Sequence, residues 1–156
     1  MAELQIGDIA PDFELPRDGG GTMSLQALRG RPVVLYAYPK DDTSGCTAQA
    51  VDFTTLKPAF EQKGITVVGI SPDSAKKHDK FKQKHGLDVD LIADEEKTTL
   101  QSLGVWKEKS MYGRKYMGVE RSTFLIDKDG RLAQIWRKVS VPGHAQEVLA
   151  AAEQLV

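Results

Sequence analysis

The sequence predicts an α/β fold in which a central mixed sheet is flanked by helices. Two apolar runs rich in β-branched residues, 33–38 and Ile65–Ile70, are separated by a helical segment that begins at Cys46. Strand, helix and strand in this order form a βαβ unit with parallel strands. Later in the chain, two strands flank the turn sequence 128–130, which is a strong hairpin signal, and a helical pattern closes the chain. A βαβ unit, a hairpin and a final helix are the order of a thioredoxin-like sheet.

The individual elements follow from the period of the apolar residues and from turn residues. Short apolar segments at Phe13–Leu15 and Met23–Leu25, with glycines between them, predict an N-terminal β-hairpin. The run 33–38 is apolar at every position, which is typical of a strand covered on both faces. The other expected elements are a helix over Cys46–Lys63, a helix over Ala75–His85, a strand at Asp90–Ala93, a helix over Glu96–Leu103, strands at Ser122–Asp127 and Leu132–Trp136, and a helix over Ala145–Val156.

Two stretches depart from a regular pattern. Pro58 lies inside the helix expected over Cys46–Lys63, and it should kink or break that helix near Lys57, because proline lacks an N–H group and clashes with the preceding turn. Residues 104–119 contain glycines, Trp106 and basic side chains without a clear period, and we predict a long loop there.

The composition is that of an ordinary globular protein. The 156 residues are enough for a buried core, and we expect one domain over 1–156. A formal net charge of −1 provides no basic field for nucleic acid or anionic lipid, and no apolar run reaches the length of a membrane span. The N-terminal residues do not resemble a signal peptide, so we expect a cytoplasmic protein. The one cysteine excludes a disulfide framework and a Cys-rich zinc site.

The single thiol, Cys46, occupies a place with a specific chemical consequence. It follows a strand, Pro39 and a turn, and it begins a helix for which Thr43 or Ser44 is the candidate N-cap. Unpaired N–H groups and the positive end of the helix dipole both favour a thiolate over a thiol. From the residues alone, two interpretations stay open: a reactive thiolate, or a small buried hydrophobic side chain.

A resemblance to a known family separates these interpretations. The segment 38–47, with Pro39, Thr43 and Cys46 in the spacing Pro-x-x-x-Thr-x-x-Cys, resembles the active-site segment of peroxiredoxins. The residues of this segment, together with those of 120–127 later in the chain, resemble the branch known as peroxiredoxin Q or bacterioferritin comigratory protein. The similarity extends over almost the whole chain, from Asp12 to the C-terminal helix.

The resemblance implies a thiol peroxidase that reduces hydrogen peroxide and alkyl hydroperoxides. Cys46 matches the peroxidatic cysteine, Thr43 and Pro39 match its motif partners, and Arg121 matches a distant arginine. A thiolate is the nucleophile in such chemistry, and an arginine can stabilise negative charge on the sulfur and on the leaving oxygen. The Thr43 hydroxyl can bind a peroxide, and Pro39 shapes the site. No metal, haem, flavin or other cofactor is implied, and the branch is often monomeric.

This chain departs from the family pattern at four positions. Ser44 stands where proline is common, and Gln49 stands where glutamate is common. The two usual positions of a resolving cysteine hold Val51 and Lys82. We therefore expect no internal disulfide, so that an external thiol reductant (thioredoxin, glutaredoxin or a small thiol) must restore Cys46.

The alternative from another class is a non-catalytic thioredoxin-like binding module or holdase in which Cys46 is structural. A disulfide oxidoreductase is disfavoured because the chain has no Cys-x-x-Cys motif. The histidines His78, His85 and His144 lack metal-ligand spacing. We expect His78 and His85 on the surface of a charged helix and His144 in a loop or at a helix start.

Overall fold

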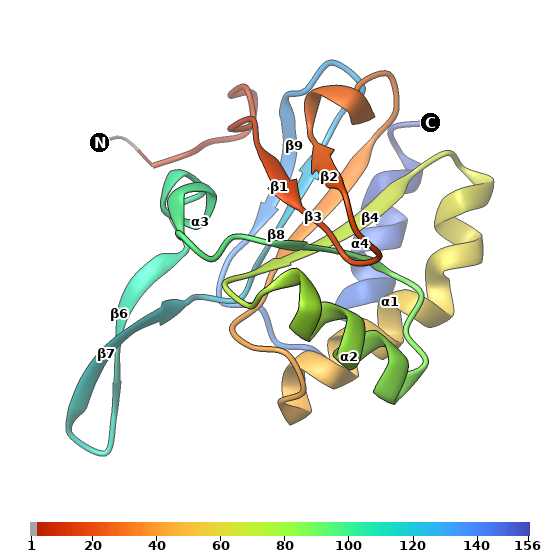
Figure 1. The fold of residues 1–156 in the computed structure, drawn as a ribbon. Helices are drawn as coiled ribbons and strands as arrows, with labels where there is room; N and C mark the ends of the chain where they lie inside the picture. Colours follow the sequence, from red (N-terminus) through yellow and green to blue (C-terminus); the bar gives the residue numbers. More distant parts are fainter. Residues whose placement is uncertain (1–2) are drawn as a thin grey trace.

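The computed structural model describes residues 3–156, so the first two residues of the expected domain 1–156 lie outside it. A five-stranded sheet in the order β5-β4-β3-β8-β9 forms its centre (Figure 1). Strand β3 pairs in parallel with β4 and antiparallel with β8, so the sheet is mixed as predicted. The strands of this sheet are β3 (Val33–Ala37), β4 (Thr66–Ser71), β5 (Asp90–Ala93), β8 (Ser122–Ile126) and β9 (Leu132–Trp136).

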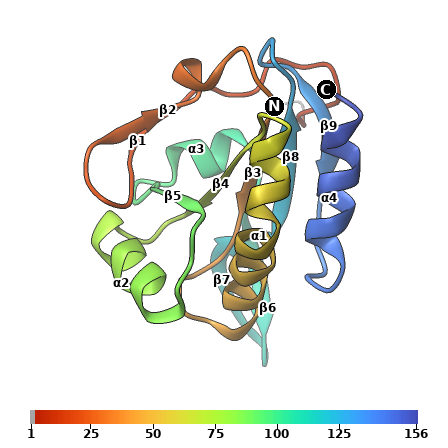
Figure 2. The same ribbon diagram turned by 90° about the vertical axis from the view of Figure 1, so that its right-hand side faces the viewer.

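Helices and a hairpin cover the two faces of this sheet. Helices α1 and α4 lie side by side on one face, and α2 lies on the same face beside β5 (Figure 2). The opposite face is covered by the N-terminal hairpin β1–β2, which confirms the predicted hairpin, and by α3. These elements are β1 (Glu14–Pro16), β2 (Thr22–Ser24), the 3₁₀ helix η1 (Gln26–Leu28), α1 (Ser44–Gln62), α2 (Ala75–His85), α3 (Thr98–Ser102) and α4 (His144–Glu153).

Strand β3 separates the two halves of the core. Its side chains alternate between the faces: Val33, Leu35 and Ala37 belong to the cluster under the N-terminal hairpin and α3. Val34 and Tyr36 belong to the cluster under the three helices, which also contains Cys46. All residues of β3 are buried, which confirms the prediction of a strand covered on both faces.

The predicted long loop over 104–119 is wrong. Strands β6 (Trp106–Met111) and β7 (Arg114–Val119) pair antiparallel and form a hairpin that projects from the body of the protein (Figure 1). Its turn is Tyr112-Gly113, both with positive φ, which is the signature of a two-residue hairpin turn. The strands lack alternation of apolar and polar residues because most of their side chains are exposed on both faces. The periodicity on which a strand prediction depends is therefore absent.

The predicted break at Pro58 is also absent. Helix α1 runs without interruption through this residue from Ser44 to Gln62. Tertiary packing outweighs the local cost of the proline, since Phe53 and Phe60 on either side of it are completely buried against the sheet.

His78 is buried rather than exposed, contrary to the expectation for a charged helix. It lies on the inner face of α2 with no exposed surface, whereas the lysines 76, 77, 80 and 84 of the same helix are exposed. His85 is half-buried, and His144 is the first residue of α4, where its Nε2 lies 2.8 Å from the Thr123 hydroxyl. Within residues 3–156, no helix has both the length and the apolar character needed to cross a membrane.

Gly69 of β4 provides the space for Tyr36, and this leads to a prediction about stability. A Cβ atom at position 69 would lie 2.7 Å from Tyr36 Cζ and 2.8 Å from Leu91 Cδ2. Gly69→Ala should therefore lower the free energy of unfolding by about 1–3 kcal/mol through overpacking. Urea unfolding measures this loss. Gln83→Ala on the exposed side of α2 is the control, with an expected change within about 0.5 kcal/mol. Equal stabilities of the two variants would contradict the packing argument.

Candidate active site

Cys46 lies in the first turn of α1, and its thiol is buried. The side chain is 2% exposed and packs in the cluster that contains Tyr36 and Phe53. Thr43 is the N-cap, and its carbonyl accepts the first helical hydrogen bond from Thr47 N–H at 2.8 Å. The N–H groups of residues 44–46 therefore have no partner within the helix, and the positive end of the helix dipole is directed at this turn. Both features favour negative charge on the sulfur.

Arg121 reaches this thiol from a distant part of the chain. Its Nη2 donates to Cys46 Sγ at 3.3 Å. The register of the sheet explains the contact: Ala37 at the end of β3 lies opposite Ser122 at the start of β8, so the residues just beyond both strands meet at the same edge. Gly45 leaves room for the guanidinium, because a Cβ atom there would lie 3.3 Å from Nη2. A buried thiolate therefore has a permanently charged partner.

Gln49 is a residue of the site for which the sequence predicted no role. It lies one turn after Cys46 on α1 and is 1% exposed. Its Oε1 accepts a hydrogen bond from Arg121 Nη1, while its buried Nε2 has no partner among residues 3–156. The partner of Arg121 is thus a neutral amide. The signal in the sequence was the spacing of three residues after Cys46, which places both side chains on one face of a helix.

A second cation, Lys109, lies near this group. It is half-buried on β6, where its aliphatic chain covers Gly118 at the place that a side chain there would occupy. Burial lowers the pKa of Lys109, and the charge of Arg121 lowers it further, whereas the negative charges of Cys46 and Glu120 oppose this. The sequence could not place Lys109 at the site, because its pattern predicts a loop where this strand lies.

Tyr36 of β3 belongs to the same buried cluster as Cys46. Its ring stacks on Phe53 with centroids 4.7 Å apart, and its buried hydroxyl has no hydrogen-bond partner among the described residues. Burial raises the pKa of Tyr36 far above its usual range, and the nearby charges of Cys46 and Asp41 raise it further. Tyr36 therefore stays neutral and contributes no anion to compete with a thiolate.

Thr43 and Pro39 lie in the loop between β3 and α1. Thr43 is exposed, and its hydroxyl donates to the Lys40 carbonyl at 2.9 Å rather than to Cys46. Pro39 is half-buried directly after the buried strand segment. The structure therefore joins Cys46 and Arg121 by direct contact, and it places Thr43 one turn before the thiol as the N-cap.

Comparison with known proteins identifies the family of the chain. Residues 6–135 match the model of the AhpC/TSA family. The chain belongs to this family. It is 49% identical over 146 residues to peroxiredoxin Bcp of Bacillus subtilis (strain 168), an alignment that covers 94% of this chain and 93% of the relative. These matches confirm the predicted peroxiredoxin resemblance.

Solved structures of similar proteins share the fold. The bacterioferritin comigratory protein of Xanthomonas campestris, studied for alkyl peroxide reduction with trapped intermediates and ligands, superposes with a TM-score of 0.89 at 42% identity, covering 97% of this chain and 96% of that one. A mutant of Xylella fastidiosa PrxQ gives a TM-score of 0.92 at 38% identity, covering 99% and 98%. The predicted thioredoxin-like class with a mixed central sheet is thereby confirmed.

The two positions at which the family resemblance implies a second thiol differ in exposure and in contacts. Val51 is 42% exposed on α1. Lys82 is half-buried on α2, where its Nζ lies 2.7 Å from Asp18 Oδ2. Neither residue is a cysteine, and the chain contains no second thiol with which Cys46 could form a disulfide.

The neutral partner of Arg121 leads to a prediction about the thiol. Gln49→Glu would place a carboxylate against the guanidinium and offset part of its charge. The fraction of Cys46 present as thiolate at neutral pH should fall by about three- to tenfold, since a nearby anion disfavours a second one. Ultraviolet titration of the thiolate measures this fraction.

The matched control adds the same charge on the other face of the sheet. Gln101→Glu at an exposed position of α3 should leave the titration unchanged. Arg121→Met removes the cation completely, so its loss of thiolate should be the largest that any change at position 49 can cause. If Gln49→Glu titrated like the wild type, the amide would have no electrostatic role.

Proposed function

We propose that this chain is a thiol peroxidase that reduces hydrogen peroxide and alkyl hydroperoxides with Cys46 as the nucleophile. The observation that carries the proposal is the contact of Arg121 Nη2 with the buried Cys46 Sγ at 3.3 Å, in the first turn of α1. Isolated buried charge is costly, and a structural cysteine needs no guanidinium. This feature favours a peroxidase over a binding module or holdase with an inert cysteine.

The proposed reaction transfers one oxygen atom. The Cys46 thiolate attacks the terminal oxygen of the peroxide, the O–O bond breaks, and its electron pair leaves with the second oxygen. That oxygen takes a proton and departs as water or alcohol, while Cys46 becomes a sulfenic acid. Negative charge moves from Sγ to the leaving oxygen during this step. Arg121 stabilises the charge at both ends, because its several N–H groups remain charged.

The residues around the thiol have subsidiary roles in this proposal. The N–H groups of the first turn of α1 stabilise the thiolate, and the exposed hydroxyl of Thr43 leaves the Lys40 carbonyl to bind the peroxide. Pro39 contributes shape and excludes water, because it offers no N–H group. Lys109 adds a second positive charge on the side of the β6–β7 hairpin.

The recycling half of the reaction requires a reductant from outside. The thiol of thioredoxin, glutaredoxin or a small molecule attacks the sulfenic sulfur and releases water, and a second thiol then frees Cys46 from the mixed disulfide. We further propose that the chain acts as a monomer and as one domain.

Substitution of the nucleophile tests the proposed activity. Cys46→Ser should abolish peroxide consumption and leave the fold intact, because a hydroxyl is hardly ionised at neutral pH. Peroxide loss with a thiol reductant present, followed together with circular dichroism, measures both. A rate close to that of the wild type in the Cys46→Ser protein would refute the proposal, and the holdase alternative predicts no peroxide consumption in either protein.

The recycling step is tested by intact mass after treatment with peroxide. The wild type should gain one to three oxygen atoms or form a disulfide-linked dimer, because its sulfenic acid has no internal thiol partner. Lys82→Cys, which supplies a thiol on α2, should instead lose two hydrogens as an intrachain disulfide forms after local unwinding. Overoxidation of Lys82→Cys to the same extent as the wild type would show that α2 does not deliver residue 82 to Cys46.

A further inference from the structure

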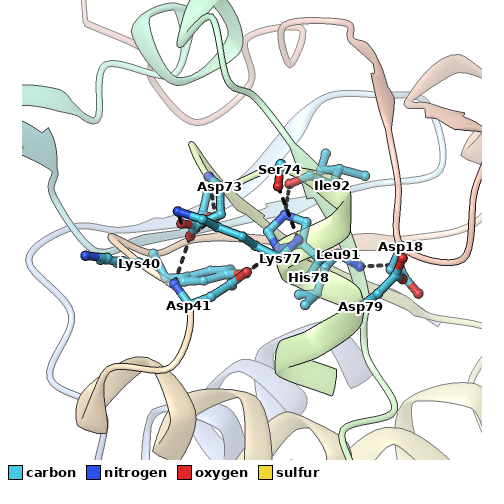
Figure 3. Close-up of polar contacts among 12 residues, drawn as sticks. Asp18, Lys40, Asp41, Asp73, Ser74, Lys77, His78, Asp79, Leu91 and Ile92 are labelled. Atoms are coloured by element: carbon cyan, nitrogen blue, oxygen red, sulfur yellow. Dashed lines mark hydrogen bonds and ion pairs between the residues drawn. The ribbon is translucent and has the colours of Figure 1, made fainter. Parts of the chain in front are cut away.

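His78 is a buried side chain that joins three elements near the thiol and has no part in the reaction described above. It projects from α2, and its Nδ1 lies 2.7 Å from Oδ2 of Asp41 in the loop before α1. Its Nε2 lies 2.9 Å from the carbonyl oxygen of Ile92 in β5. Figure 3 shows the imidazole between these two partners.

These partners determine where the protons lie. A carbonyl oxygen only accepts, so Nε2 carries a hydrogen, and a further proton lies between Nδ1 and the Asp41 carboxylate. Burial acts to lower the pKa of His78, but the hydrogen bond to Asp41, the charge of Asp41, the Ile92 carbonyl and the charge of Asp73 together raise it. Below about pH 6.5 the pair is therefore an imidazolium facing a carboxylate.

Asp41 is held from several sides. The Tyr38 hydroxyl donates to its Oδ1, and its backbone N–H donates to Asp73 Oδ2 at 2.8 Å. Asp73 in turn accepts from the Ser71 hydroxyl at 2.8 Å. The titratable groups that face His78 are thus Asp41 and Tyr38 after β3 and Asp73 after β4, while β5 contributes only a carbonyl.

The next residue of the loop is also bound by α2. Asp42 has a φ of 63°, a conformation that residues other than glycine rarely adopt. Its carboxylate pairs with Lys84 Nζ and His85 Nε2, both at 2.7 Å. Helix α2 is itself fixed to the N-terminal hairpin, because Lys82 contacts Asp18 at 2.7 Å and Asp79 accepts from Gly19 N–H at 2.7 Å.

This loop determines where the helix of the nucleophile begins. Thr43 directly follows the two bound aspartates, and it caps α1 through its carbonyl and donates back to Lys40. We infer that His78 and Asp41 are positioning residues for the peroxide reaction, whose shared proton holds the loop so that Thr43 and the first turn of α1 are aligned around Cys46. This inference rests on the proposed peroxidase function.

Two amide substitutions separate positioning from simple stability. His78→Asn keeps a donor near the place of Nδ1 and so retains the bond to Asp41, whereas His78→Gln reaches the place of Nε2 and retains only the bond to Ile92. Each variant loses one buried hydrogen bond. We expect the second-order rate constant with peroxide to fall about ten- to a hundredfold in His78→Gln and about threefold or less in His78→Asn. Stopped-flow measurement on reduced, folded protein gives these rates.

The control breaks a different contact of the same helix. Lys82→Met removes the ion pair with Asp18 and should leave the rate constant unchanged. Equal losses in His78→Asn and His78→Gln, or a similar loss in Lys82→Met, would overturn the inference, because either result means that general stability of α2 is responsible. If the His78 variants do not fold, Asp41→Asn decides: a slowed reaction supports the inference and an unchanged one overturns it.

The pH dependence provides a readout that a structural role would not change. Since the folded-state pKa of His78 is raised, the effect of the pair is fully present below about pH 6.5 and is lost as the pH rises through that pKa. The ratio of wild-type to His78→Gln rate constants should therefore shrink as the pH rises above about 6.5 and through the raised pKa of His78. A constant ratio would overturn the inference alone, whereas absence of any reaction in the wild type would overturn the proposed function with it.

Discussion

The antiparallel pairing of β8 with β3 is the interaction on which the whole site depends. It sets Ser122 opposite Ala37, so that the residue before β8 and the loop after β3 meet at one edge of the sheet. Arg121 is then placed beside a thiol that is distant in the sequence. A buried thiolate without a cation is unstable, and the half-buried guanidinium of Arg121 is in turn stabilised by an anion beside it. The register of β3 and β8 therefore stabilises the Cys46 thiolate and the Arg121 guanidinium together, because it places them side by side.

The other neighbours of the sulfur are consistent with this condition because they add no negative charge. Tyr36 is kept neutral by burial, and Gln49 offers Arg121 an amide oxygen in place of a carboxylate. Within the described part of the chain, Arg121 forms no salt bridge, so its charge remains available to Cys46. The amide nitrogen of Gln49 is buried without a hydrogen-bond partner among the described residues, and this lowers the stability of the fold. A residue with a structural role alone would give no reason for this loss.

Much of this arrangement could be predicted from the sequence, and the failures have identifiable causes. Apolar runs and turn residues located the central strands, and the position of Cys46 at a helix start followed from the turn before it. The β6–β7 hairpin was missed because strands exposed on both faces lack the apolar period, and with it Lys109 was missed. His78 was misplaced because it lies among lysines on α2, and only the fold shows that it lies on the inward side of the helix and faces Asp41. The contact of Arg121 with Cys46 came from the family resemblance, since no local pattern links residues that a sheet register brings together.

Position 82 determines how the sulfenic acid formed in the peroxide reaction can be recycled. Where the family pattern places a second thiol, this chain has a lysine whose ammonium is bound to Asp18 at 2.7 Å. A disulfide between positions 82 and 46 would require α2 and the start of α1 to unwind, because the thiol is buried and both elements are tied to the loop between them. With a lysine at this position the sulfenic acid has no internal thiol partner, and Asp41 and Asp42 are held by other residues of α2, namely His78, Lys84 and His85. The ion pair of Lys82 joins α2 to the N-terminal hairpin and not to the loop before Cys46, so the residue at position 82 bears on recycling while His78 and Asp41 bear on the attack by the thiolate.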